Sequence, residues 1–218
     1  MAEINLLRRY PKAKRNIQKR AEAQSPENIA LARQYGQAYF DGPRDQGYGG
    51  YRYDGRWVAI AEDMVGHWGL KAGDRVLDVG AAKGFLVKDL MKVCPGLEAF
   101  GLDISEYALM NCEPEVVGRL HLGSAVSLPF PDGSFQAVSA INVLHNLDRA
   151  DCIRAVREIE RLAPGRGYIQ VDSYRTLEEK ELFLSWVLTA KTHYDPAGWI
   201  ELFQEAGYTG DFYWTIVE

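Results

Sequence analysis

The stretch VLDVGAAKGF, residues 76–85, decides the fold. Its first four residues have the apolar character of a buried β-strand and carry an acid, Asp78, near the strand end. Gly80 and Gly84 enclose only small residues and one lysine, so the backbone can turn tightly and a ligand can lie against it. From Phe85 onward the apolar spacing predicts a helix. A strand, a glycine-rich turn and a helix in this order are typical of a parallel α/β sheet.

The same alternation continues along the chain after Arg75. Short β-like runs alternate with helical segments of ten to fifteen residues; the runs are 76–79, 99–102, 135–141 and 168–171, and the clearest helices are 85–93 and 149–162. We therefore expect an α/β fold with a doubly wound, mostly parallel sheet and helices on both faces. The stretch FYWTIV near the end of the chain also has the pattern of a strand, and we expect six or seven strands in total.

An N-terminal segment, residues 1–56, precedes this domain, which we assign to residues 57–218. Ser25 followed by Pro26 predicts the start of a helix that continues to about Tyr39. The loop DGPRDQGYGGYRYDG, residues 41–55, comes next, and its glycines predict a mobile lid. An apolar helical pattern then extends from Trp57 to Trp68.

Composition places the chain among ordinary globular proteins. It has 218 residues, 47% of them hydrophobic and 25% charged, which is enough to bury one full core. No stretch approaches the roughly 20 apolar residues of a membrane span, and the N-terminus lacks the apolar centre of a secretory signal, so we expect a cytoplasmic protein without membrane contact. The three cysteines are too scattered for a disulfide framework or a zinc cluster, so we expect reduced thiols and no metal.

Positive charge is concentrated at the N-terminus. Residues 1–20 carry seven bases against Glu3 alone, a local balance of +6 that leaves −11 for the rest of the chain. The bases are Arg8, Arg9, Lys12, Lys14, Arg15, Lys19 and Arg20. Such an arm can bind RNA through its phosphates, but a run this short more often folds onto its own acidic body. We therefore do not expect nucleic acid as the partner.

The glycine-rich turn favours a cationic ligand over a dinucleotide. Counting from Gly80, the two further glycines of G-x-G-x-x-G would stand at Ala82 and Phe85, so that fingerprint fails. A pyrophosphate at this turn would also meet the negative charge of Asp78 where it needs bare amides.

The segment from Asp78 to Gly84 resembles the first motif, D/E-x-G-x-G-x-G, of the class I S-adenosylmethionine-dependent methyltransferases, with Ala82 in place of the middle glycine. In the stretch FGLDIS a second predicted strand ends at Asp103. The family places an acid at this position, where its carboxylate binds the ribose hydroxyls. The two oxygens of a carboxylate match the geometry of a vicinal diol. LPFPDGSFQAVSAINVLHNL (128–147) and REIERLAPGRGYIQVDS (157–173) resemble later strand segments of the same family. The resemblance covers about residues 71–173 and implies a Rossmann-like domain that binds S-adenosylmethionine.

This resemblance implies a set of cofactor-binding residues. At the position of Ser124, many members of the family have an acidic residue that contacts the adenine amino group, and at the position of Gln136 the usual residue is Asp. The resemblance therefore supports the adenine contact less strongly than the ribose contact. The set comprises Asp78, Gly80, Ala81, Gly84, Asp103, Ile104, Ser124, Ala125 and Asn142, together with Tyr51 and Arg56 of the lid. The lid run, residues 40–57, resembles that of small members associated with bacterial surface carbohydrate and capsule modification, in which tyrosines and arginines would close over the cofactor carboxylate and an anionic acceptor.

Catalysis on a sulfonium donor requires orientation and exclusion of water, and a base only where the acceptor loses a proton. His145 follows the predicted fourth strand and is the first candidate base. Asp172, at the end of the fifth, could orient a hydroxyl or amine, and His193 is a further candidate. We interpret His67 and His121 as structural.

Three functions compete. The first is a methyltransferase for a small-molecule acceptor, an oxygen of a sugar, nucleotide sugar or phosphorylated compound. The second is an RNA methyltransferase that uses the basic arm, although SAINVLHNL lacks the N/D-P-P-Y/F sequence typical of methylation on exocyclic amines. The third is a partner subunit that binds the cofactor without chemistry. The reacting atom and the oligomeric state stay open.

Overall fold

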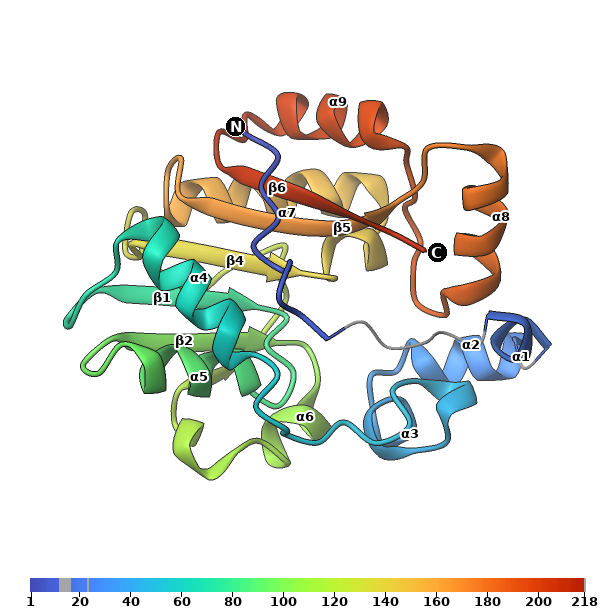
Figure 1. The fold of residues 1–218 in the computed structure, drawn as a ribbon, viewed down its shortest axis with the longest axis horizontal. Helices are drawn as coiled ribbons and strands as arrows, with labels where there is room; N and C mark the ends of the chain where they lie inside the picture. The colour runs from blue at the N-terminus through green and yellow to red at the C-terminus, as the bar shows by residue number, and fades with distance from the viewer. Residues whose placement is uncertain (12–16, 23, 218) are drawn as a thin grey trace.

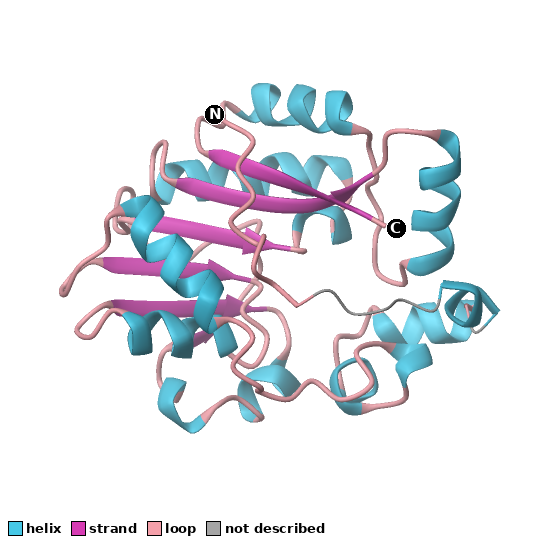
Figure 2. Ribbon diagram, viewed as in Figure 1, coloured by secondary structure: helices cyan, strands magenta, loops and turns pink. Residues whose placement is uncertain are grey.

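All six strands of the sheet run parallel, in the order β3-β2-β1-β4-β5-β6 (Figures 1 and 2). The structure, a computed structural model, describes residues 1–11, 17–22 and 24–217, so Lys12, Lys14 and Arg15 of the basic arm lie outside the described residues. The strands are β1 (Arg75–Val79), β2 (Glu98–Asp103), β3 (Leu120–Leu122), β4 (Ala137–Ile141), β5 (Gly167–Ser173) and β6 (Asp211–Ile216). The predicted fold class is confirmed.

Helices cover both faces of this sheet, which is why its strands are apolar on both sides. On one face, α4 (Val58–Trp68) and α5 (Phe85–Val93) pack with N-terminal residues over Val76, Ala99 and Ala137. On the other face lie α7 (Arg149–Leu162) and α9 (Pro196–Ala206). The helices predicted at 85–93 and 149–162 are confirmed at those bounds, because each carries one clear apolar face.

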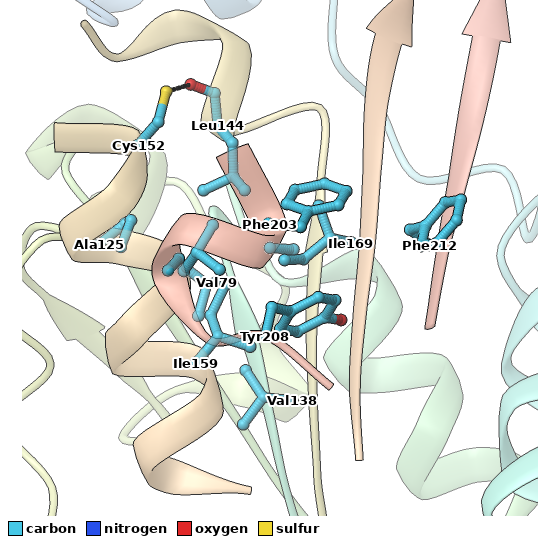
Figure 3. Close-up of a cluster of buried hydrophobic side chains, with 14 of the residues drawn as sticks. Val79, Ala125, Val138, Leu144, Cys152, Ile159, Ile169, Phe203, Tyr208 and Phe212 are labelled. Atoms are coloured by element: carbon cyan, nitrogen blue, oxygen red, sulfur yellow. Dashed lines mark hydrogen bonds between the residues drawn. The ribbon is translucent and has the colours of Figure 1, made fainter. Parts of the chain in front are cut away.

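The larger core lies between the sheet, α7 and α9 (Figure 3). The fully buried rings of Trp199 and Phe203, from α9, are centred 6.1 Å apart, and Phe203 stacks on Trp214 of β6 at 6.2 Å. Cys152 is a buried free thiol whose Sγ donates to the carbonyl of Leu144 at 2.9 Å. Burial raises the pKa of this thiol to about 11. It is therefore a core residue, as expected from its isolated position.

Six strands, and no seventh within the described ranges, form the sheet. β6 begins one residue before the predicted strand FYWTIV, residues 212–217, and ends one residue before its end. It pairs in parallel with β5 from Tyr168↔Asp211 to Ser173↔Ile216. A single parallel bridge joins Glu3 to Phe212 on the outer edge of β6. The N-terminal backbone thus protects part of an edge that would otherwise expose unpaired amides.

Two arginines of the basic arm fold onto the acidic body, as the charge pattern favoured. Arg8 and Arg9 both pair with Asp63 of α4, at 3.2 and 2.9 Å, and Arg9 also pairs with Glu62 at 3.0 Å. No helix in the described ranges is both long and apolar enough to cross a membrane.

The rest of the N-terminal segment forms short helices beyond the carboxyl ends of the strands (Figure 1). The elements are α1 (Ile17–Glu22), α2 (Pro26–Ala32), α3 (Gln37–Asp41) and the 3-10 turn η1 (Arg44–Gln46). The continuous helix predicted up to Tyr39 is wrong: Ser25 caps α2 as expected, but Tyr35 adopts φ +49° and Gly36 is extended, so the chain breaks before α3. This break bends α3 over the sheet edge.

The remaining short elements lie at the same edge or on the β3 side. They are α6 (Glu106–Met110), the 3-10 turns η2 (Pro114–Val116) and η3 (Leu144–Asn146), and α8 (Leu177–Trp186). α8 contacts both α1 and β5, and it lies beyond the carboxyl end of β5 (Figure 1).

The close approach of the glycine-rich turn to β2 makes Gly101 indispensable. A Cβ at Gly101 would lie 2.6 Å from both Ala81 Cβ and Leu120 Cδ2. We expect Gly101→Ala to lower the free energy of unfolding by about 1–3 kcal/mol through overpacking. Gly66→Ala in α4 is the matched control, since no atom lies within 4 Å there, and should raise stability by about 0.5–1 kcal/mol. Urea unfolding of both variants tests this; a Gly101→Ala protein as stable as wild type would contradict it.

Candidate functional site

The strand order reverses between β1 and β4, and this is where an open parallel sheet binds its ligand. Gly80, directly after β1, has φ +79°, and a Cβ there would lie 2.1 Å from Val143 Cγ2. Asn142, directly after β4, adopts φ +58°, which asparagine tolerates better than most residues. The structure thus brings two predicted cofactor residues, Gly80 and Asn142, to the same crevice.

Asp78 is a buried acid at the carboxyl end of β1. Its side chain is 6% exposed, and Ser139 Oγ donates to its Oδ1 at 2.7 Å. Burial raises the pKa of Asp78 to about 7, the Ser139 hydrogen bond opposes this, and the nearby Asp103 carboxylate raises it again. The site therefore holds an acid whose ionised form is poorly stabilised by the protein.

Asp103 is a second buried acid, at the end of the neighbouring β2. Its Oδ2 accepts the amide of Ala82 at 2.7 Å and its Oδ1 the amide of Ser105 at 2.8 Å. Burial raises the pKa of Asp103, while these amides oppose the rise. Each oxygen retains a further lone pair, so the carboxylate can still accept hydrogen bonds from two hydroxyl groups.

These two acids fit the sulfonium nucleoside that the sequence predicts. Neither Asp78 nor Asp103 forms an ion pair with a base in the part of the chain that the structure describes, and the nearest motif base, Lys83, pairs with Asp41 instead. Buried carboxylates are stable when paired or hydrogen-bonded. A ligand that brings a positive charge and a vicinal diol would supply both kinds of partner.

The departure from the family pattern at Ala82 leaves the turn intact. Ala82 adopts φ +50°, the left-handed conformation for which glycine is the usual residue. Its methyl group packs with Phe40 and Ala108 in a small separate cluster. The contact offsets part of the backbone cost, about 1 kcal/mol for a residue with a Cβ.

The lid packs onto the glycine-rich turn. Lys83 Nζ donates to Asp41 Oδ2 at 2.6 Å, and Ser105 Oγ donates to the carbonyl of Tyr35 at 2.5 Å. Tyr51 stacks on Phe85, the first residue of α5, with ring centroids 4.6 Å apart. The predicted lid therefore lies over the cofactor turn, and Tyr51 is at the site.

Other lid residues point elsewhere. Arg56, a predicted cofactor ligand, pairs with Asp54 and donates to Tyr10 Oη at 3.3 Å. Tyr53 Oη donates to Asp89 Oδ1 at 2.6 Å. The roles of Asp41 and Lys83 in fastening the lid were not predictable from the sequence, because 42 positions separate the two residues and neither belongs to a motif for ion pairing.

His145, in η3, lies next to Asp172, near the carboxyl end of β5. The amide of Asp172 donates to His145 Nδ1 at 3.2 Å, and His145 Nε2 lies 3.8 Å from Asp172 Oδ2. Burial lowers the pKa of His145, and the Asp172 carboxylate partly opposes this. The hydrogen bond to Nδ1 assigns the proton of the neutral ring to Nε2, which faces the carboxylate. Of the two side chains, Asp172 is the more exposed, at 15% against 6%.

The remaining predicted residues are spread around the crevice. Ala81 and Gly84 belong to the turn itself, and Ile104, directly after Asp103, is 60% exposed. Ser124 and Ala125 follow β3, and Ala125 is buried in the larger core. His193 packs against Phe183 of α8, and its Nδ1 is buried without a hydrogen-bond partner in the described residues.

The two histidines interpreted as structural contact groups outside the proposed cofactor residues. His67 Nε2 contacts Asp211 Oδ2 at 3.1 Å. His121 pairs with Leu102, one residue before Asp103, and its ring packs edge-on against Phe130.

Part of the chain matches a known protein family. Residues 77–171 match the protein-family model described as "Methyltransferase domain". The matched segment contains both buried acids and the glycine-rich turn.

Among similar proteins, a demethylmenaquinone methyltransferase from Symbiobacterium thermophilum is 32% identical over 128 residues, 55% of this chain and 50% of that protein. A 27-O-demethylrifamycin SV methyltransferase from Amycolatopsis mediterranei is 28% identical over 138 residues, with the same two coverages of 55% and 50%. The chain thus spans about half the length of these curated relatives.

A solved structure supports the fold. An N-methyltransferase from Haemonchus contortus, in complex with phosphomonomethylethanolamine and S-adenosylhomocysteine, superposes with a TM-score of 0.58 at 18% identity, and the match covers 81% of this chain and 44% of that one. At this identity the likeness concerns the fold alone.

The raised pKa of Asp78 predicts a pH-dependent cost of folding. The pKa of Asp78 is about 7 in the folded protein and near 4 in the unfolded chain. The folded state therefore binds the proton more tightly, and the stability that this provides is complete below pH 4 and is lost as the pH rises through about 7. We expect ligand-free Asp78→Asn to be more stable than wild type at pH 8, by on the order of 2–4 kcal/mol, and the difference to vanish near pH 4. Urea unfolding at pH 4 and pH 8 measures this difference.

Asp195→Asn is the control for this experiment, because Asp195 is an exposed helix cap and asparagine caps equally well. Its pH dependence should follow that of wild type. A loss of stability in Asp78→Asn at pH 8 would show that the ionised carboxylate is not a cost to the fold.

Proposed function

We propose that the chain is an S-adenosylmethionine-dependent methyltransferase that acts on a small molecule. The observation that carries this proposal is the pair of buried acids, Asp78 and Asp103, at adjacent strand ends beneath a glycine-rich turn. Asp103 would hold the ribose hydroxyls, and Asp78 would stabilise positive charge on the same ligand. When bound, S-adenosylmethionine supplies a methyl group on a good leaving group, so the protein mainly orients the acceptor and excludes water.

A hydroxyl acceptor fits the groups at the end of β5. The Asp172 carboxylate is partly exposed and can accept a hydrogen bond from a hydroxyl, while the neutral His145 ring directs its Nε2–H toward that carboxylate. Asp172 would then hold or remove the acceptor proton, with His145 orienting it and His193 at the edge of the same region. The name of the rifamycin relative, which implies methylation of an oxygen, agrees with this proposal.

The finer assignment to a sugar, nucleotide sugar or phosphorylated acceptor stays a prediction. Arg44 donates to the carbonyls of Gly47 and Tyr48, and Arg56 pairs with Asp54, so both guanidiniums already bind lid groups. The names of the two curated relatives, a demethylmenaquinone and a demethylrifamycin methyltransferase, do not support surface carbohydrate as the target. Acceptor screening should therefore include phenolic and quinol compounds beside sugars and phosphorylated compounds, with release of S-adenosylhomocysteine as the readout.

Loss of the ribose contact should weaken cofactor binding. We expect Asp103→Ala to raise the Kd for S-adenosylhomocysteine by about 10- to 100-fold, because charge-assisted hydrogen bonds contribute about 1.5–3 kcal/mol. Isothermal titration calorimetry measures this, with NAD as the competing ligand. Unchanged affinity, or tighter binding of NAD, would refute the assignment of the crevice.

Loss of the Asp172 carboxylate should reduce catalysis much more than it weakens cofactor binding. We expect Asp172→Asn to lower kcat at least about tenfold and to change the cofactor Kd less than about twofold. His145→Gln retains an N–H donor and should keep more activity than His145→Ala. Full activity in Asp172→Asn, once an acceptor is known, would exclude it as the group that contacts the acceptor.

A further inference from the structure

The backbone carbonyl of His145 is held by the segment that joins α8 to α9, residues 187–195. In this α8–α9 loop the amides of Lys191 and Thr192 both donate to the His145 carbonyl, at 2.8 and 3.0 Å. His145 lies in η3, a single 3-10 turn, and such turns have poorer hydrogen-bond geometry than an α-helix. The position of His145 therefore depends on these two bonds from outside its own turn.

The far end of the α8–α9 loop is fastened to β5. Ser173 Oγ donates to the Tyr194 carbonyl at 2.9 Å, and the indole Nε1 of Trp199 donates to the Asp172 carbonyl at 3.2 Å. Ser173 and Trp199 are both buried, so this end of the loop is fixed against the sheet. The loop thus contacts the turn that carries His145 and the strand that carries Asp172.

The N-terminal segment holds the other end of the loop. Gln24 Nε2 donates to the carbonyls of Val187 and Leu184, at 2.6 and 3.1 Å, and Arg20 Nε donates to the carbonyl of Trp186 at 3.3 Å. Carbonyls in the last turn of a helix have no partner within the helix, so side chains from outside can bind them. α1 packs against α8 beside these bonds (Figure 1). Residues from the start of the chain thus fix the end of α8 and the start of the loop.

One peptide group of the loop connects the N-terminal segment directly to His145. Arg33 Nη2 donates to the Ala190 carbonyl at 3.3 Å. That carbonyl belongs to the same planar peptide group as the Lys191 amide, which donates to the His145 carbonyl. The peptide group is therefore held at both ends. Because a cation on its oxygen polarises its N–H, the bond from Arg33 also strengthens the bond to His145.

We propose that Arg33 positions His145 through the Ala190–Lys191 peptide group, and that Gln24 keeps the α8–α9 loop in place. The proposal rests on the proposed function, in which His145 orients the Asp172 carboxylate. Arg33 and Gln24 are positioning residues, since they act through the loop. The N-terminal segment, which packs on the glycine-rich turn, thus also sets the geometry of the groups at the end of β5.

Replacement of Arg33 by methionine tests the proposal without an acceptor. We expect the Lys191 amide of Arg33→Met to exchange with solvent about 3- to 10-fold faster than in wild type, because its peptide group loses one hydrogen bond. Amide exchange followed by NMR measures this. The nitrogen chemical shifts of the His145 ring should change as well, since they report the bond from the Asp172 amide to Nδ1. Arg33→Lys retains the cation and should recover part of both effects, which a merely structural role would not predict.

Gln34→Met is the matched control. Gln34 is the next residue along the chain, is exposed, and makes no side-chain hydrogen bond within the ranges that the structure describes. Its replacement should change neither the exchange of the Lys191 amide nor the His145 shifts. Gln24→Met removes the donor at the start of the loop and should act in the same direction as Arg33→Met, so the test stays valid if one of the two variants folds poorly.

Titration with S-adenosylhomocysteine separates the two proposals. We expect the Kd values of wild type, Arg33→Met and Gln24→Met to agree within about twofold, because both replacements act on the loop and leave the glycine-rich turn intact. If wild type does not bind this ligand, the proposed function fails, and the positioning role that rests on it fails too.

If wild type binds S-adenosylhomocysteine but Arg33→Met has the Lys191 exchange and His145 shifts of wild type, the positioning role is refuted and the proposed function stands. A loss of cofactor affinity in Arg33→Met as large as the change in Lys191 exchange would show a general effect on the crevice and would also refute it. Changed Lys191 and His145 signals with an unchanged Kd, partly reversed in Arg33→Lys, confirm the positioning role.

Discussion

Three successive amides of the glycine-rich turn donate to the end of β2, and the remainder of the site depends on this attachment. Gly80 and Ala81 donate to the carbonyl of Leu102 at 2.7 and 3.1 Å, and Ala82 donates to the Asp103 carboxylate. The turn and the acid that would hold the ribose are therefore a single rigid unit. Gly101 has no side chain at the point where β2 passes the turn, which permits this approach.

Burial of two acids beside the glycine-rich turn has an electrostatic cost for the stability of the fold. Asp78 and Asp103 are buried close to each other, and the described residues offer backbone amides and one hydroxyl in place of a cation. A hydrophobic pair would cost the fold less. Retaining acids here is understandable if a cationic ligand stabilises them, because strain and unsatisfied charge concentrate at functional sites.

The N-terminal segment completes the crevice that the sheet leaves open. Phe40 packs on Ala82, Asp41 binds Lys83, and Tyr51 stacks on Phe85, so successive lid residues contact successive residues of the turn and helix α5. At its outer side Arg20 and Arg44 both lie over the Trp186 ring, at 5.5 and 5.4 Å, which connects the lid to α8. The N-terminal segment thus extends from the glycine-rich turn to helix α8.

The sequence by itself determined the sheet, its first turn and the helices α5 and α7, because apolar periodicity and glycine spacing are local properties. It also identified Asp78 and Asp103, since acids at strand ends stand out against apolar runs. It did not determine the break at Tyr35 or the orientation of Arg56 away from the crevice. Those depend on which distant groups meet, such as Asp41 with Lys83 or Arg56 with Tyr10, and only tertiary packing decides such meetings.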